Sequence, residues 1–93
     1  MITAFCLLKV SRDKVDDVAQ KLGDMKGITE VYSVAGPWDL IAVVRAKDNE
    51  SLADLVTGQM LKVEGIRDSM THIAFRVYSK YDLDRLFSVG SDF

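Results

Sequence analysis

Residues 28–46 read ITEVYSVAGPWDLIAVVRA, and the topology of the whole chain follows from them. Two runs rich in β-formers, residues 28–35 and 38–46, flank the dipeptide Gly36-Pro37. Glycine and proline are typical turn residues, and two strand-like runs joined this tightly are typical of a β-hairpin. The stretch therefore predicts two antiparallel strands in the middle of the chain, with the remaining elements on either side.

The segments outside the hairpin alternate between strand and helix patterns. Residues 2–10 (ITAFCLLKV) are rich in β-formers and apolar at nearly every position, which indicates a buried strand. Apolar side chains recur at helical spacing over residues 15–25 and again over residues 52–60, the second run following the capping pair Asp48-Asn49. Residues 66–78 (IRDSMTHIAFRVY) predict a long final strand. The predicted order is β-α-β-β-α-β.

A short internal repeat supports this order. The sequence KGITE at residues 26–30 recurs as EGIRD at residues 64–68, each time after a predicted helix and at the start of a predicted strand. Two βαβ-like halves predict a ferredoxin-like α+β fold, with a four-stranded antiparallel sheet and two helices on one face. We expect one domain over residues 1–79 and a tail over residues 80–93, in which DLDRLF forms a short helix.

Composition and charge exclude several classes of function. The 93 residues carry a net charge of −2, and their lysines and arginines are scattered rather than gathered in a basic stripe, so direct nucleic-acid binding is not expected. The sequence has one cysteine, Cys6, and one histidine, His72, so it cannot form a cysteine cluster or a metal site with several histidines. No cofactor is expected. The sequence shows no signal pattern and no bilayer-length apolar run, so we expect no membrane partner and a cytoplasmic protein.

The predicted strands are apolar on both faces of the sheet. In residues 2–10, Ala4, Cys6 and Leu8 lie on one face, while Phe5 and Leu7 lie on the other. In residues 38–46 the corresponding sets are Trp38, Leu40, Ala42 and Val44 against Ile41 and Val43. Two short helices can cover one face, and the other would expose roughly several hundred Å2 of apolar surface. We expect a second copy to pack sheet against sheet as a dimeric α/β barrel; the alternative is cover by the tail through Leu83, Leu86 and Phe87.

Three features together resemble a known module: the turn VAGPWDL at residues 34–40, the glycine-led strand GIRDSMT at residues 65–71, and the βαββαβ order. To about Tyr78 the chain resembles the ligand-binding (RAM) domain of the Lrp/AsnC family of feast/famine transcriptional regulators. The resemblance implies a homodimer, a higher ring of dimers (octamer-like), and an amino acid or similar small effector at the contact between dimers. Because the chain begins at the first strand, we expect no helix-turn-helix domain, and the resemblance implies possible co-assembly with full-length regulators.

The resemblance also implies a ligand site near the hairpin turn and the last strand. Its candidate ligand-binding residues are Gly36, Pro37, Trp38, Asp39, Ser69 and Thr71. Ser69 and Thr71 share a strand face, so their hydroxyls could hold a ligand carboxylate. Family hairpins commonly read Gly-Asp-aromatic-Asp, whereas Pro37 supplies neither an acidic side chain nor a backbone donor for a ligand ammonium. Purely structural roles are the alternatives: a tight turn for Gly36, packing for Trp38 and hairpin capping for Asp39.

The sequence thus predicts an effector-binding and oligomerisation module that is not an enzyme and has no catalytic residues. One alternative is a cofactor-free dimeric ferredoxin-like enzyme of the monooxygenase or isomerase type, for which His72 is the only candidate base of the usual kind. The other is a ligand-free assembly adaptor. Ligand-induced thermal stabilisation separates a sensor from an adaptor.

Overall fold

The computed structural model describes residues 1–78 of the chain. The elements run in the predicted order, with two short 3-10 helices added: β1 (Ile2–Val10), the 3-10 helix Arg12–Lys14, α1 (Val15–Gly23), β2 (Ile28–Ser33), β3 (Leu40–Ala46), α2 (Asn49–Gly58), the 3-10 helix Met60–Lys62 and β4 (Ile66–Ile73).

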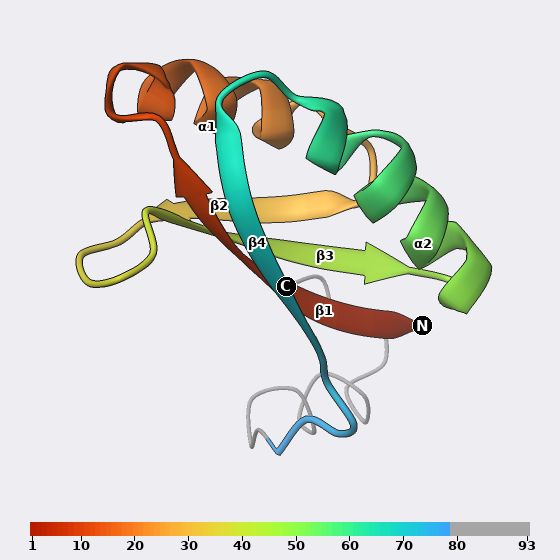
Figure 1. The fold of residues 1–93 in the computed structure, drawn as a ribbon. Coiled ribbons are helices and arrows are strands. Elements are labelled where there is room, and N and C mark those ends of the chain that lie inside the picture. The colour runs from red at the N-terminus through yellow and green to blue at the C-terminus, as the bar shows by residue number, and fades with distance from the viewer. Residues whose placement is uncertain (79–93) are drawn as a thin grey trace.

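The four strands form one antiparallel sheet in the order β2-β3-β1-β4. Both helices cross the same face of this sheet, and within residues 1–78 the opposite face carries no helix (Figure 1). The central strand β1 pairs with β3 on one side and β4 on the other, so that Cys6 lies opposite both Ala42 and Thr71. The predicted ferredoxin-like α+β topology is confirmed.

The core lies between the sheet and the helices. The side chains predicted to share one face of β1 and β3 are buried there, apart from Trp38, which precedes β3. They pack against Val18 and Leu22 of α1 and against Leu52, Leu55 and Val56 of α2. The buried side chains of each helix lie toward the sheet, because positions three and four apart share a helix face.

The ends of three strands differ from the sequence prediction. β2 ends at Ser33 and β3 begins at Leu40, so the hairpin is closed by the six residues 34–39 rather than by a tight turn at Gly36-Pro37. Gly36 takes a φ of +124°, and the backbone N–H of Val34 closes the loop by donating to the carbonyl of Asp39. β4 ends at Ile73 rather than residue 78: Ile73 lies opposite Ala4, and the N–H of Ala74 makes one further bond, to the carbonyl of Thr3. The predicted boundary at residue 79 and the short helix within 80–93 lie outside the described residues.

The two copies of the internal repeat share an unusual backbone conformation at their glycine. Gly27 and Gly65 adopt φ values of +101° and +109°, in the region that favours glycine. Each glycine reverses the chain between the helical layer and a strand, and its carbonyl then accepts a hydrogen bond from a distant segment: Arg45 N–H for Gly27 and Ser11 N–H for Gly65. The repeated motif therefore marks equivalent corners of the two βαβ-like halves.

Within residues 1–78, no helix is long and apolar enough to cross a membrane. The same residues contain no group of three or more His, Cys, Asp or Glu side chains that could hold a metal ion.

Asp48 caps α2 through a hydrogen bond from the backbone N–H of Ser51 to its Oδ1, at 2.8 Å. This bond lowers the pKa of Asp48 from 3.8, so the capping contribution is present at neutral pH and is lost as the pH falls through the folded-state value. We expect Asp48→Ala to lower the melting temperature at pH 7, and this deficit to shrink on acidification below pH 3.8. Thermal unfolding followed by circular dichroism, with Asp54→Ala on the same helix as control, measures both effects. An equal deficit at both pH values would contradict the capping role.

Candidate functional site

The helix-free face of the sheet is apolar at its centre. Leu7 of β1 lies opposite Ile41 of β3 and Met70 of β4, and Ile41 in turn lies opposite Tyr32 of β2. Phe5, Tyr32 and Met70 remain 40%, 49% and 47% exposed. We call this surface the open face; it comprises Phe5, Leu7, Tyr32, Ile41, Val43 and Met70. The prediction that the strands are apolar on both faces is confirmed.

A polar cleft of about 390 Å3 lies at one end of the sheet, where β1 ends, β3 begins and β4 begins. Its lining combines two cations and two carboxylates. Lys9 and Asp68 lie opposite each other in the β1–β4 register, which brings opposite charges together in the lining of the cleft. The full lining is Lys9, Val10, Asp39, Arg67 and Asp68.

Asp39 joins the hairpin to β1. Its backbone N–H donates to the carbonyl of Leu8 at 2.8 Å, and its Oδ2 accepts from the backbone N–H of Val10 at 2.8 Å. The side chain thus replaces a backbone acceptor at the point where the β1–β3 ladder ends. Among residues 1–78, the other carboxylate oxygen, Oδ1, has no hydrogen-bond donor.

The remaining charged groups of the cleft are also held in place. The backbone N–H of Ser69 donates to Asp68 Oδ1 at 2.8 Å, which orients that carboxylate. The Nζ of Lys9 lies 5.6 Å from the ring centroid of Trp38, a cation–π distance. Trp38 is half-buried in the loop before β3 and serves as a support for Lys9.

The structure places the sequence-predicted site residues in three settings. Asp39 lines the cleft, and Trp38 adjoins it through Lys9. Gly36 and Pro37 are exposed in the hairpin loop and do not line the cleft. Ser69 and Thr71 share a strand face as predicted, but it is the face that carries the helices, because they lie opposite the buried Leu8 and Cys6.

The Thr71 hydroxyl donates to Cys6 Sγ at 3.7 Å. Burial raises the pKa of the Cys6 thiol, and the hydroxyl opposes this rise in part. Both groups thus take part in a contact at the edge of the core.

His72 lies on the same side of the sheet as the open face, opposite Phe5 in the β1–β4 register. Within residues 1–78 its imidazole has no hydrogen bond and no carboxylate within salt-bridge distance. A general base is normally oriented by such a partner.

Three of the four charged residues of the cleft, Lys9, Arg67 and Asp68, are not among the site residues predicted from the sequence. Their association depends on the strand register, because Lys9 and Asp68 are 59 positions apart in the chain and meet only when β1 pairs with β4. The available signal was the βαββαβ order, which makes the first and last strands neighbours.

The protein family described as the Lrp/AsnC ligand binding domain matches residues 3–83 of this chain. The HTH-type transcriptional regulator FL11 of Pyrococcus furiosus is 33% identical over 79 residues, which cover 85% of this chain and 52% of the regulator. The chain thus spans about half the length of the curated relatives that it matches.

Solved structures agree in fold. The crystal structure of TTHA0845 from Thermus thermophilus has a TM-score of 0.82 and 42% identity, covering 86% of this chain and 100% of that one. A transcriptional regulator from Neisseria meningitidis, NMB0573, solved as an L-Met complex, shares the fold at 16% identity, with a TM-score of 0.74 over 81% of this chain and 50% of its own. On the extent of the family match and the shared fold, this chain belongs to the Lrp/AsnC family, as a ligand-binding domain related to its transcriptional regulators.

Proposed function

We propose that this chain is an effector-binding, self-associating module of the Lrp/AsnC regulatory system, and that its effector is an α-amino acid or a similar small zwitterion. The observation that carries the proposal is the polar cleft, which presents charges of both signs in a domain of a ligand-binding family. Two copies pack through their open faces, which removes the exposed apolar side chains from water.

The charges of the cleft match those of a zwitterion. Lys9 and Arg67 supply cations for an α-carboxylate, and charge-assisted hydrogen bonds of this kind are the strong ones. The ammonium group is received by Asp39 and Asp68, each of which has one oxygen committed to a backbone N–H and a second oxygen available. A volume of about 390 Å3 lies within the usual range of small-molecule sites.

The candidate residues outside the cleft can contact a ligand only in an assembly of several copies. Gly36, Pro37, Ser69 and Thr71 do not line the cleft of a single chain, so their proposed role in binding needs a ligand held at a contact between dimers. A ring of dimers, implied by the family resemblance, provides such contacts. We further propose that the module co-assembles with full-length regulators and performs no catalysis.

A thermal-shift screen of the twenty amino acids, beginning with L-methionine, tests the effector. A ligand at one hundred times its dissociation constant stabilises the folded state by about 2.7 kcal/mol, which raises the melting temperature of a domain this size by about 11–22 °C. We expect at least one amino acid to produce such a shift in the wild type, and Arg67→Gln or Asp68→Asn to remove most of it.

The control is Arg12→Gln, which removes an exposed cation from the 3-10 helix after β1 and leaves the cleft intact. If the cleft is the ligand-binding site, the wild type and Arg12→Gln show equal ligand-induced shifts in melting temperature. Absence of a shift with all twenty amino acids refutes the effector class and favours an adaptor. An unaltered shift in Arg67→Gln and Asp68→Asn places the site elsewhere.

A further inference from the structure

The polar cleft has two walls, and each wall presents one cation and one carboxylate. Arg67 and Asp68 of β4 form the first wall, and Lys9 of β1 with Asp39 of the hairpin loop forms the second. Among residues 1–78, none of these four side chains forms an ion pair. Their charges are therefore available to a ligand.

A β-bulge places Arg67 and Asp68 in the same wall. Lys9 pairs with Asp68 and Val10 pairs with Ile66, so the β1–β4 register skips Arg67. Neighbouring residues of a regular strand point to opposite faces of the sheet. An extra residue in one strand interrupts this alternation and re-aims a side chain, and here both Arg67 and Asp68 line the cleft. The first wall thus presents a guanidinium directly beside a carboxylate.

The second wall is positioned by the backbone of β1. The N–H of Asp39 donates to the carbonyl of Leu8, and the N–H of Val10 donates to Asp39 Oδ2, so the two bonds lie on either side of Lys9 in the chain. The Nζ of Lys9 lies 5.6 Å from the ring centroid of Trp38. This wall therefore offers a ligand one donor, the Lys9 ammonium, and one acceptor, Asp39 Oδ1.

We propose that the first wall binds the α-carboxylate and the α-ammonium group of the effector, and that the second wall selects a carboxamide side chain. The inference rests on the effector binding proposed above and deepens it by naming the class of amino acid. Arg67 suits the α-carboxylate because a guanidinium can form two parallel hydrogen bonds with it. One oxygen of Asp68 is held by the N–H of Ser69, and the other accepts from the ammonium.

Charge balance determines the side-chain class. A zwitterionic head group neutralises one cation and one carboxylate, which leaves Lys9 and Asp39 facing the side chain. A charged side chain meets one of these two groups with like charge, and an aliphatic one leaves both without a hydrogen-bond partner. A carboxamide offers its oxygen to Lys9 and its NH2 to Asp39 Oδ1. Within residues 1–78 the only apolar residue lining the cleft is Val10, which is 6% exposed, so an apolar side chain finds little surface to cover.

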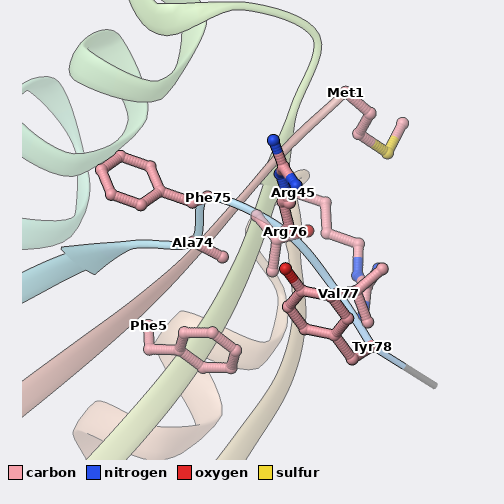
Figure 2. Close-up of a pocket in the computed structure, with 9 residues that line it drawn as sticks. Met1, Phe5, Arg45, Ala74, Phe75, Arg76, Val77 and Tyr78 are labelled. Carbon is pink, nitrogen blue, oxygen red and sulfur yellow. The ribbon is translucent and has the colours of Figure 1, made fainter.

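A larger hollow at the other end of β1 lacks this combination of charges. It measures about 630 Å3 and is bordered in part by residues 74–78, which continue past the last bond of the β1–β4 ladder (Figure 1). Figure 2 shows the rings of Phe5 and Tyr78 in its lining, together with the guanidinium groups of Arg45 and Arg76. No carboxylate side chain of residues 1–78 lines it, so an α-ammonium group has no anionic partner there.

Calorimetric titration with two sets of amino acids of matched shape tests the side-chain class. L-Glutamine, L-glutamate and L-methionine have side chains of similar length, and L-asparagine, L-aspartate and L-leucine have side chains of similar branching. We expect the carboxamide of at least one set to bind at least about tenfold more tightly than both other members, which is the effect of about one hydrogen bond to a charged group.

Asp39→Asn reverses the preference between amide and acid. The amide oxygen of the variant still accepts from the N–H of Val10, but an NH2 group replaces the free oxygen and turns an acceptor into a donor. The acid of the preferred set should then bind more tightly than its amide, because the new donor and Lys9 both favour a carboxylate. Asp17→Asn, the same change at an exposed site on α1, is the control and keeps the order of the wild type.

The outcomes separate this inference from the proposed function. If the tightest ligand among the twenty amino acids has no carboxamide, the inference is overturned and effector binding still stands. An Asp39→Asn chain that keeps the order of the wild type, or that weakens all ligands alike, also overturns it, because Asp39 then does not read the side chain. If no amino acid binds the wild type, the proposed effector fails and the inference fails with it.

Discussion

We expect a Phe5→Asp chain to run as a monomer at concentrations where the proposed self-association makes the wild type a dimer, with a dimer dissociation constant raised at least about a hundredfold. Phe5 lies on the open face, opposite Val43 and His72. A carboxylate at this position would have to lose its water in a largely apolar interface, a cost that the neighbouring His72 and Arg45 offset only in part. Sedimentation equilibrium over a range of concentrations measures the constant, and circular dichroism confirms that the variant is folded.

Leu61→Asp is the matched control, because Leu61 is 38% exposed against 40% for Phe5 but lies in the 3-10 helix after α2, in the helical layer. The same change of charge and polarity there leaves the dimer intact. If both variants dissociate alike, the effect comes from net charge rather than from the open face. If neither dissociates, or the wild type is a monomer, the open face is not the interface.

Replacing Gly65 by alanine destabilises the fold by about 2–3 kcal/mol, a large share of the stability of a domain this size. Gly65 has a φ of +109°, which an L side chain rarely adopts. An added Cβ would also lie 3.0 Å from Val18 Cγ2 and 3.1 Å from Lys14 Cβ, so the corner between β1, α1 and β4 would have to open. Urea denaturation gives the free energy of unfolding.

Gly23→Ala controls for the loss of a glycine as such. Gly23 is the last residue of α1, has no positive φ, and an added Cβ would meet nothing within 4 Å. Since alanine favours the helix by about 1 kcal/mol over glycine, this variant should be as stable as the wild type or slightly more so. If Gly65→Ala and Gly23→Ala lower the free energy of unfolding equally, neither the positive φ of Gly65 nor the crowding around it explains why glycine recurs at this position of the repeat.

The order of the elements could be predicted from the sequence because it depends on local patterns. The β-forming, mostly apolar run of residues 2–10 and the helical spacing after Val15 are each visible within a short window of the sequence. The glycines at 27 and 65 carry a backbone requirement that no other residue meets easily. The strand ends were predicted less well: β4 ends at Ile73, opposite Ala4, although the strand-like pattern of the sequence continues to residue 78.

The candidate site, like the fold, could be predicted from the sequence only in part. A role for Asp39 could be expected from its place after the turn, but its bonds to Leu8 and Val10 depend on the pairing of β1 with β3. Ser69 and Thr71 were correctly predicted to share a face, and only the assembled sheet shows that it is the face that carries the helices.

Composition and periodicity were thus sufficient to establish the βαββαβ order, the apolar character of both sheet faces and the special place of the two corner glycines, since each is a property of neighbouring residues. The meeting of Lys9, Asp39 and Asp68 in one cleft, and the extension of residues 74–78 past the sheet, came from the folded chain alone. Both depend on the register between strands far apart in the chain. That register is fixed by the packing of the core, and no short stretch of residues encodes it.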